Sequence, residues 1–183
     1  MHIIPEAIAE KVALPRVRPR NGRAVVTVLL LGLATFGMAG ALAGEATILG
    51  ERDGKSIVTV RVTEATQSKQ ALPIFPGISG KTAGAKSLSL LKVVIPPGGS
   101  AEAHVHRGFE SAIYLVQGRV ETRYGEGLKK GVINEAGDFI FVPADVPHQP
   151  FNLSDTEPAI AIVARSDPNE QEHTILCGDS RKD

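Results

Sequence analysis

The chain has 183 residues, of which 43% are apolar, so it is long enough for one domain with a substantial core and too short for two. Lysine plus arginine and aspartate plus glutamate both number 20, and this balance provides neither a basic excess for nucleic acid nor an acidic tail. Aromatic residues make up only 4%, so a base-stacking surface is not expected and nucleic acid is excluded as a partner.

Residues 1–43 are predicted to be a signal peptide or a membrane anchor. An uncharged apolar run covers residues 24–43 and ends in Ala41-Leu42-Ala43, a pattern typical of signal-peptide cleavage. Four arginines precede this run: Arg16, Arg18, Arg20 and Arg23. We expect cleavage after Ala43 and a periplasmic or secreted protein. Uncleaved, the run is long enough to anchor the chain, with the arginines in the cytoplasm, and membrane contact is expected only through this segment.

The rest of the chain contains short β-rich runs separated by glycine, proline, asparagine and aspartate. Residues 44–86 are predicted to be an N-terminal arm with the first strands, including a strand at 56–62 and a long loop or arm over 63–84. Residues 87–165 form the predicted core, and the polar tail 166–183 lies over it or extends freely. The strands expected in the core are 87–95, 101–106, 111–117, 119–124, 139–142 and 159–165. Such spacing, with turn residues between strands, indicates an all-β antiparallel sandwich or barrel.

Three of the five histidines lie within the predicted core. His104 and His106 are two residues apart on one strand, so their side chains share a face about 7 Å apart. Glu110 comes just before the next strand, and His148 follows the turn at 143–147. Imidazole with a carboxylate suits iron, manganese, zinc, nickel or copper and leaves coordination positions open. A His-x-His pair alone is a weak signal, because a single histidine is more often a surface or hydrogen-bonded residue.

The spacing around these residues forms two ordered motifs. In the first, Gly98 is followed after five residues by His104, then His106, after three more residues Glu110, and later Gly118. In the second, Gly137 is followed after five residues by Pro143, then by His148 and, after three residues, Asn152. Together they resemble the two motifs of the cupin superfamily. Residues 106–114, 124–127 and 167–172 further resemble a bacterial group of small single-domain cupins described as similar to mannose-6-phosphate isomerase.

The resemblance implies a jelly-roll β-barrel with a divalent transition metal held inside by His104, His106, Glu110 and His148. The sequence departs from the family pattern at two places. One extra residue separates Glu110 from Gly118, which suggests a bulge or a shifted turn and makes Glu110 the ligand most affected. Asp145 stands where the family has a glycine, and aspartate is among the few residues that tolerate positive φ.

The function expected from this resemblance is a metal-dependent enzyme of oxygenase or isomerase/epimerase type that acts on a small oxygen-bearing substrate. Tyr114 would share the inward face with Glu110 in a regular strand and is a candidate acid/base group; the alternative is core packing with its hydroxyl at the rim. A non-catalytic exported cupin that binds a small ligand or metal is the second hypothesis, and an inert scaffold is the third. The resemblance also implies a homodimer, in which the strand at 56–62 docks on a neighbour's edge.

Overall fold

The structure is a computed structural model that describes residues 46–169 and 173–178, so the predicted targeting segment 1–43 lies outside the described residues. Within the described ranges the chain is almost entirely β, and helix is limited to α1 (Gly80–Ala83) and the single 3-10 turn η1 (Glu126–Leu128). None of the helices formed by described residues is long and apolar enough to cross a bilayer.

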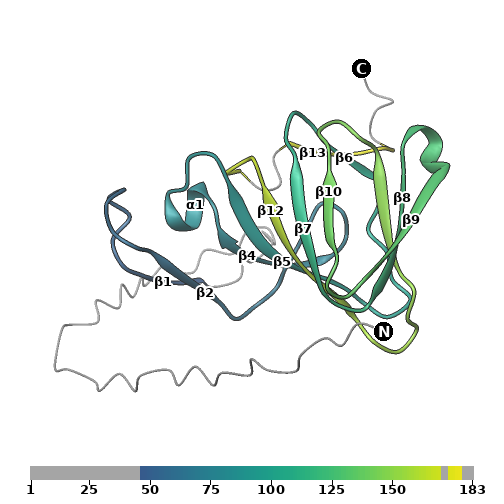
Figure 1. The fold of residues 1–183 in the computed structure, drawn as a ribbon. Coiled ribbons are helices and arrows are strands. Elements are labelled where there is room, and N and C mark those ends of the chain that lie inside the picture. Colours follow the sequence, from purple (N-terminus) through teal and green to yellow (C-terminus); the bar gives the residue numbers. More distant parts are fainter. Residues whose placement is uncertain (1–45, 170–172, 179–183) are drawn as a thin grey trace, which may run out of the picture. The chain divides into compact units, whose positions relative to one another are not determined.

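Two antiparallel sheets build the barrel (Figure 1). The larger sheet has six strands in the order β10-β7-β12-β5-β4-β3, and the smaller has five in the order β13-β6-β11-β8-β9. The six strands span β10 (Phe139–Val142), β7 (Ser111–Gln117), β12 (Ala159–Arg165), β5 (Ser89–Ile95), β4 (Pro73–Ile78) and β3 (Thr66–Gln67). The five span β13 (Thr174–Leu176), β6 (His104–His106), β11 (His148–Asn152), β8 (Arg119–Tyr124) and β9 (Lys130–Glu135). Strands adjacent in space are often distant in sequence, as in a jelly roll.

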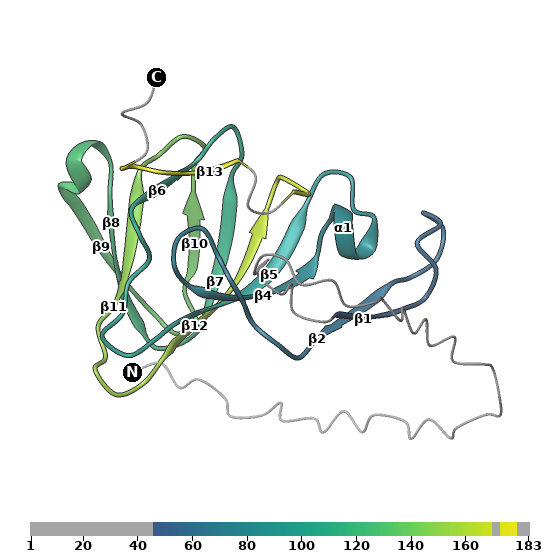
Figure 2. The same ribbon diagram turned by 180° about the vertical axis from the view of Figure 1, so that it is seen from behind.

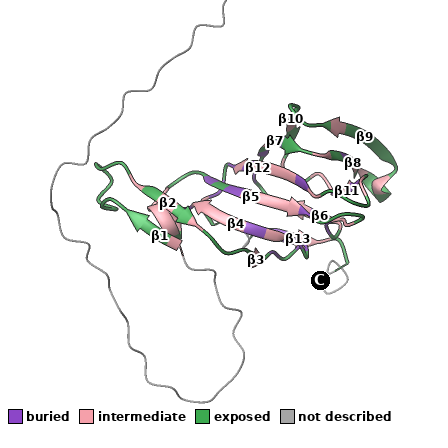
Figure 3. Ribbon diagram, turned by 90° about the horizontal axis from the view of Figure 1, so that it is seen from below, coloured by how far each residue is buried: buried purple, intermediate pink, exposed green. Residues whose placement is uncertain are grey.

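A third, two-stranded sheet forms an arm beside the barrel. It pairs β1 (Ala46–Leu49) with β2 (Thr59–Val62) in antiparallel register. Seen from behind, the arm projects past α1 (Figure 2). Most of its residues are exposed (Figure 3). Ile57, in the turn region before β2, is 92% exposed. No residue of β1 or β2 is fully buried, so the arm has no hydrophobic layer of its own, and a lone hairpin of this kind is only marginally stable in water.

The hydrophobic core lies between the two large sheets. One buried cluster joins side chains from both sheets: Leu72, Ile95, Ala101, Leu115, Val120 and Ala159. A second cluster, made of Ile74, Leu91 and Val163, extends this core along the six-stranded sheet. Most of these core side chains also line the interior space that the histidines of β6 and β11 enter.

The all-β antiparallel prediction is confirmed, and the strands predicted at 111–117 and 119–124 have the observed bounds. The glycines of the two motifs, Gly98, Gly118 and Gly137, all have positive φ. Gly118 is also fixed by space, because a Cβ there would lie 2.9 Å from the Cα of Ala159. The loop predicted over 63–84 is wrong, since it contains β3, β4 and α1. The polar tail contributes β13, which pairs with β6 across the barrel mouth.

Candidate metal centre

The structure brings His104, His106 and His148 together inside the barrel. His104 and His106 project from the same face of β6, and His148 begins β11 directly opposite His104 in the antiparallel register. The ligand nitrogens of the three rings all lie within 4.8 Å of one another. All three side chains are buried, with at most 5% of their surface exposed. Three imidazoles from two paired strands thus converge on one point, as a metal site requires.

Hydrogen bonds fix the orientation of each ring through its Nδ1 atom. His104 Nδ1 lies 2.7 Å from the Glu102 carbonyl, and His148 Nδ1 lies 2.9 Å from the Val146 carbonyl. A carbonyl only accepts, so in both rings Nδ1 carries the proton and Nε2 keeps its lone pair. His106 Nδ1 lies 2.9 Å from the Ser111 hydroxyl, which accepts when Nδ1 is protonated. Partners of this kind orient metal-binding histidines in proteins.

The His106 ring gives a direct test of whether a metal fits. Its Nε2 atom is buried and has no hydrogen-bond partner among the described residues. A buried polar atom without a partner costs about 1–3 kcal/mol, so native structures rarely keep one without a function. A metal ion bound to the three imidazoles would satisfy this atom, and the donor set suits a divalent transition metal.

The electrostatic setting keeps the three rings neutral. Burial lowers the pKa of His104 to about 3, with a further contribution from the neighbouring His148. Burial and the positive charge of Arg165 lower the pKa of His106 far below its usual value. Burial likewise lowers the pKa of His148. Neutral imidazole is the form that binds a metal, so at neutral pH all three rings are ready to ligate.

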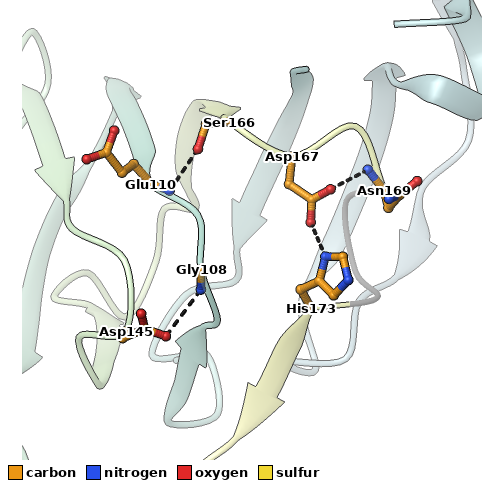
Figure 4. Close-up of polar contacts among 7 residues, drawn as sticks. All are labelled: Gly108, Glu110, Asp145, Ser166, Asp167, Asn169 and His173. Carbon is orange, nitrogen blue, oxygen red and sulfur yellow. Dashed lines mark hydrogen bonds and ion pairs between the residues drawn. The ribbon is translucent and has the colours of Figure 1, made fainter. Parts of the chain in front are cut away.

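Glu110, the fourth predicted ligand, is not brought to the three imidazoles. Its side chain is exposed, and in Figure 4 its carboxylate points away from Ser166. The backbone holds it there: the Glu110 N–H donates to the Ser166 hydroxyl over 3.0 Å, and the Ser166 N–H donates to the Glu110 carbonyl over 3.1 Å. Glu110 as a metal ligand therefore stays a prediction, and it would require this turn to rearrange.

Phe109 occupies the interior position next to Glu110. Its side chain is 3% exposed, and its ring stacks on His106 with centroids 4.8 Å apart and planes 14° from parallel. Adjacent residues in extended backbone point to opposite faces, so an inward Phe109 turns Glu110 outward. The extra residue between Glu110 and Gly118 is consistent with this change of phase.

The structure also corrects the predicted face of β7. Ser111, Ile113 and Leu115 point into the barrel, and Tyr114 points outward with 40% of its surface exposed. The Tyr114 ring contacts Phe139 on β10, with centroids 4.9 Å apart. The prediction that Tyr114 shares the inward face is therefore wrong by one residue, and a catalytic role for its hydroxyl stays a prediction.

In the second motif, the backbone conformation of Asp145 and the hydrogen bonds of Asn152 agree with what their residue types predict. Asp145 has a φ of 62°, the conformation for which the family pattern supplies glycine. Its carboxylate accepts from the Gly108 N–H over 3.2 Å, and its own N–H donates to the His106 carbonyl over 3.0 Å, so it ties the two motifs together (Figure 4). Asn152 donates to three backbone carbonyls, the shortest of these contacts being 2.7 Å to Glu157.

A cavity of about 90 Å³ lies between the sheets, beside the three histidines. Its walls are mainly apolar and come from both sheets, including Leu72, Val93, Leu115 and Ile140. Ser68 and Gln70 also reach it from the segment around β3, and Arg165 reaches it from the end of β12. Sequence reasoning missed Arg165, although it lies in phase with Ala159, Ala161 and Val163, the alternate residues that face inward on the same strand.

Sequence reasoning also missed how the tail supports the site. Asp167 is buried, and its carboxylate lies 2.6 Å from His173 Nδ1 and accepts the Asn169 N–H over 2.9 Å (Figure 4). The His173 side chain, in the tail predicted to be polar, is 54% exposed but is held by this contact. It directly precedes β13, whose Thr174 and Leu176 pair with His106 and His104. The sequence feature that could have predicted a structured tail is the Asp-Pro-Asn-Glu run after Ser166, which is typical of a turn.

Comparisons with known proteins agree with this geometry. Residues 91–165 match a family model described as a cupin domain. The auxin-binding protein ABP19b of Prunus persica is 30% identical over 119 residues, which is 61% of this chain and 51% of that protein. The chain thus spans about half the length of this relative.

Solved structures show the same fold. The oxalate decarboxylase of Lactobacillus farciminis, determined as a formate complex, superposes with a TM-score of 0.54 and 25% identity over 64% of this chain and 34% of its own. The oxalate decarboxylase of Bacillus subtilis at pH 4.6 gives a TM-score of 0.53 and 19% identity over 63% of this chain and 30% of its own. Residues 91–165 thus match a cupin domain, and these neighbours, together with the three-histidine site in the barrel, support a place for the chain in the cupin superfamily.

Proposed function

We propose that this protein is a metal-dependent cupin enzyme whose divalent transition metal is held by His104, His106 and His148. The observation that supports this most directly is the set of three buried, neutral imidazoles whose ligand nitrogens lie within 4.8 Å of one another. With three protein ligands, a four- to six-coordinate metal keeps positions open for an oxygen-bearing substrate.

The bound metal would supply Lewis-acid or redox chemistry at those open positions, in reactions of oxygenase or isomerase/epimerase type. The chain's own residues orient and shield the site. The Glu102 and Val146 carbonyls hold the His104 and His148 rings in the tautomer that leaves Nε2 for a metal, and the Ser111 hydroxyl orients the His106 ring. The apolar walls of the cavity exclude bulk water, which strengthens electrostatic interactions with a bound substrate.

The first experiment is elemental mass spectrometry on the protein purified without chelator, beside the variants His104→Ala and His148→Ala. We expect near-stoichiometric metal in the parent and its loss in both variants, because two imidazoles alone hold a divalent ion weakly. His173→Ala is the matched control, since this histidine lies outside the group and its variant should keep the metal. If the parent protein takes up no metal after incubation with each candidate ion, the proposed metal-dependent function is contradicted.

The identity of the metal then directs the search for a reaction. Iron or copper points to oxygenase assays, and manganese or zinc points to isomerase and lyase substrates. A second candidate function is a non-catalytic cupin that binds a small ligand or metal, favoured by the mainly apolar walls of the cavity. Ligand uptake without turnover by the metal-loaded protein would support that alternative.

Two further proposals concern the protein's surroundings. Export, by cleavage after Ala43 or with residues 24–43 kept as an anchor, is supported by the basic flank and the apolar run. A homodimer is supported by the exposed arm and by the exposed aromatic residues of β10. Kinship to the mannose-6-phosphate-isomerase-like group stays a prediction from residues 106–114, 124–127 and 167–172.

A further inference from the structure

The loop that joins β3 to β4 carries polar side chains into the barrel. Ser68, Gln70 and Leu72 are buried, whereas the two residues between them are exposed, so the three buried side chains share one face of the loop. Leu72 belongs to the core cluster between the two large sheets, so this face is the inner one. Gln70 is 4% exposed and lines the same cavity as the three histidines. Its carboxamide therefore lies at the cavity wall.

A backbone hydrogen bond fixes Gln70 relative to the metal centre. The Gln70 carbonyl accepts from the Glu102 N–H over 2.9 Å, and the Glu102 carbonyl in turn lies 2.7 Å from His104 Nδ1. The next residue, Ala71, has a φ of 63°, a left-handed conformation that costs stability in a residue with a side chain. Because the contact to Glu102 uses the backbone of Gln70, the side chain is held at the cavity without taking part in the contact that holds it.

The side-chain amide of Gln70 makes no hydrogen bond to any of the described residues. A carboxamide has two N–H donors and a carbonyl acceptor, and leaving them unpaired away from water costs stability. An apolar side chain of the same length would avoid this cost, because the neighbouring wall of the cavity includes Leu72, Ile74 and Ile95. A buried amide that faces a cavity and lacks a partner is what we expect of a group that binds a ligand.

The groups around the amide indicate which ligand it would bind. Apart from the three histidines and Arg165, the polar side chains that line the cavity are Ser68, Gln70 and Thr122. The Ser68 oxygen accepts the Leu72 N–H over 3.1 Å, which leaves the hydroxyl hydrogen for a ligand. A carboxamide forms two side-by-side hydrogen bonds with a ligand that carries an acceptor next to a donor. Among oxygen-bearing groups, a carbonyl next to a hydroxyl supplies this pair.

We propose that Gln70 is a specificity-determining residue of this site and that it selects ligands with a hydroxyl next to a carbonyl. The Gln70 N–H donates to the ligand carbonyl, and the Gln70 carbonyl accepts from the ligand hydroxyl. The inference rests on the proposed metal function, because it names the substrate class of the same cavity. It assigns the selection of that substrate to the loop between β3 and β4, which lies outside the two histidine motifs.

The first test measures the thermal stability of the full chain after a chelator has removed any metal. Gln70→Met replaces the amide by an apolar side chain of the same length. Because an unpaired buried amide is lost, the midpoint of thermal unfolding should rise by about 2–4 °C. Gln67→Met is the matched control, since Gln67 is exposed and does not line the cavity, and its midpoint should equal that of the parent. A lower midpoint in Gln70→Met, or its failure to fold, would show that the amide stabilises the fold and would overturn the inference.

The second test measures ligand preference in the same proteins loaded with zinc, by saturation-transfer NMR. Hydroxyacetone is the probe, and 2-butanone is its matched counterpart, with a methyl group in place of the hydroxyl. Both are small, as a cavity of about 90 Å³ requires. The parent should bind hydroxyacetone about tenfold more tightly than 2-butanone, because the amide pairs with the hydroxyl of the first ligand only. Gln70→Met should lose this preference, and Gln67→Met should keep it.

The outcomes separate this inference from the metal function. Equal affinity of the zinc-loaded parent for the two ligands contradicts this inference alone, as does a preference that persists in Gln70→Met. Zinc content should be the same in the parent and in Gln70→Met, and its loss in the variant would overturn the ligand-binding role, because the amide would then hold the metal. A parent that takes up none of the candidate metals but still prefers hydroxyacetone contradicts the metal function and leaves the role of Gln70 standing.

Discussion

Among the three histidines of the proposed metal site, His106 is held by the largest number of different contacts, because three groups fix it. Ser111 holds its Nδ1, Phe109 stacks on its ring face, and strand pairing with Thr174 holds its backbone. Its Nε2 is left for the point shared with His104 and His148. The ring is therefore oriented before a metal arrives, which reduces the entropy lost on binding.

The position of Glu110 leads to a prediction about metal affinity. Since its carboxylate is exposed and its backbone is tied to Ser166, Glu110→Gln should leave the metal dissociation constant within about twofold of the parent. Ser111→Ala, which removes the partner of His106 Nδ1, should weaken the metal by about tenfold or more. Competition with a chromophoric chelator measures both constants. A tenfold loss in Glu110→Gln would show that the turn rearranges and that the carboxylate ligates.

At the residue scale, the sequence could predict what depends on spacing and not what depends on strand phase. The convergence of His104, His106 and His148 follows from two motifs with fixed spacing, and Asp145 was expected to accept positive φ. Tyr114 was placed on the wrong face because β7 is apolar at both alternating sets of positions, so its pattern fits either phase. The phase is decided by Phe109, whose burial against His106 no local pattern reveals.

Among the elements, β13 has a structural role larger than its three residues suggest. It is the edge strand of the five-stranded sheet and pairs with β6, the strand that carries two of the three histidines. The pairing is extended on both sides, because the Arg107 N–H donates to the His173 carbonyl and the Cys177 N–H donates to the Ala103 carbonyl. The Asp167–His173 contact fixes the start of this strand.

Removing that contact should loosen β13 without removing the metal ligands. Asp167→Asn replaces a buried carboxylate that accepts from His173 and from the Asn169 N–H, and we expect a loss of about 1 kcal/mol in the free energy of unfolding. Amide hydrogen exchange should accelerate at Arg107 and Cys177, the two donors that flank the strand pairing. Asp155→Asn, at an exposed aspartate, is the control. Unchanged exchange at both amides would show that β13 is held by strand pairing alone.

Two of the strands that sequence reasoning missed, β4 and β13, have features that oppose strand prediction. β4 contains Pro73, Pro76 and Gly77, residues that are rare inside a sheet. They are tolerated because β4 neighbours only the two-residue strand β3 on its outer side, so most of that edge needs no donors. β13 is short and lies in a polar tail, and its pairing with β6 spans a long sequence separation that local patterns do not record.

At the scale of the whole molecule, the outer face of the six-stranded sheet is unusually apolar. Phe139 is 86% exposed and Phe141 61%, both on the edge strand β10. Tyr114 and Val116 continue the same face on the adjacent β7, with exposures of 40% and 48%. A contiguous apolar face beside a free edge marks an interaction surface in a soluble protein, and uncovered it invites aggregation.

A second copy of the chain is the partner we propose for this face. The arm formed by β1 and β2 exposes Ile48, Leu49 and Ile57, and a two-stranded hairpin of this kind gains stability when it packs on another sheet. In a two-fold symmetric dimer, each arm covers the β10–β7 face of the other copy, so both exposed apolar surfaces are buried by one contact. In this proposal, the β10–β7 face of the neighbouring copy is the surface on which the predicted 56–62 strand docks.

This arrangement predicts which substitutions dissociate the dimer. Phe141→Ser and Ile57→Ser should each raise the dimer dissociation constant by about thirtyfold or more, because central apolar contacts contribute about 2 kcal/mol or more. Leu153→Ser, at a residue that is 42% exposed in the loop after β11, should leave it unchanged. Sedimentation velocity over a concentration series measures all three. A parent that is monomeric at every concentration would contradict the dimer. If Phe141→Ser dissociates the dimer and Ile57→Ser does not, the proposed dimer stands but the arm is not part of its interface. The two β10–β7 faces would then pack directly on each other.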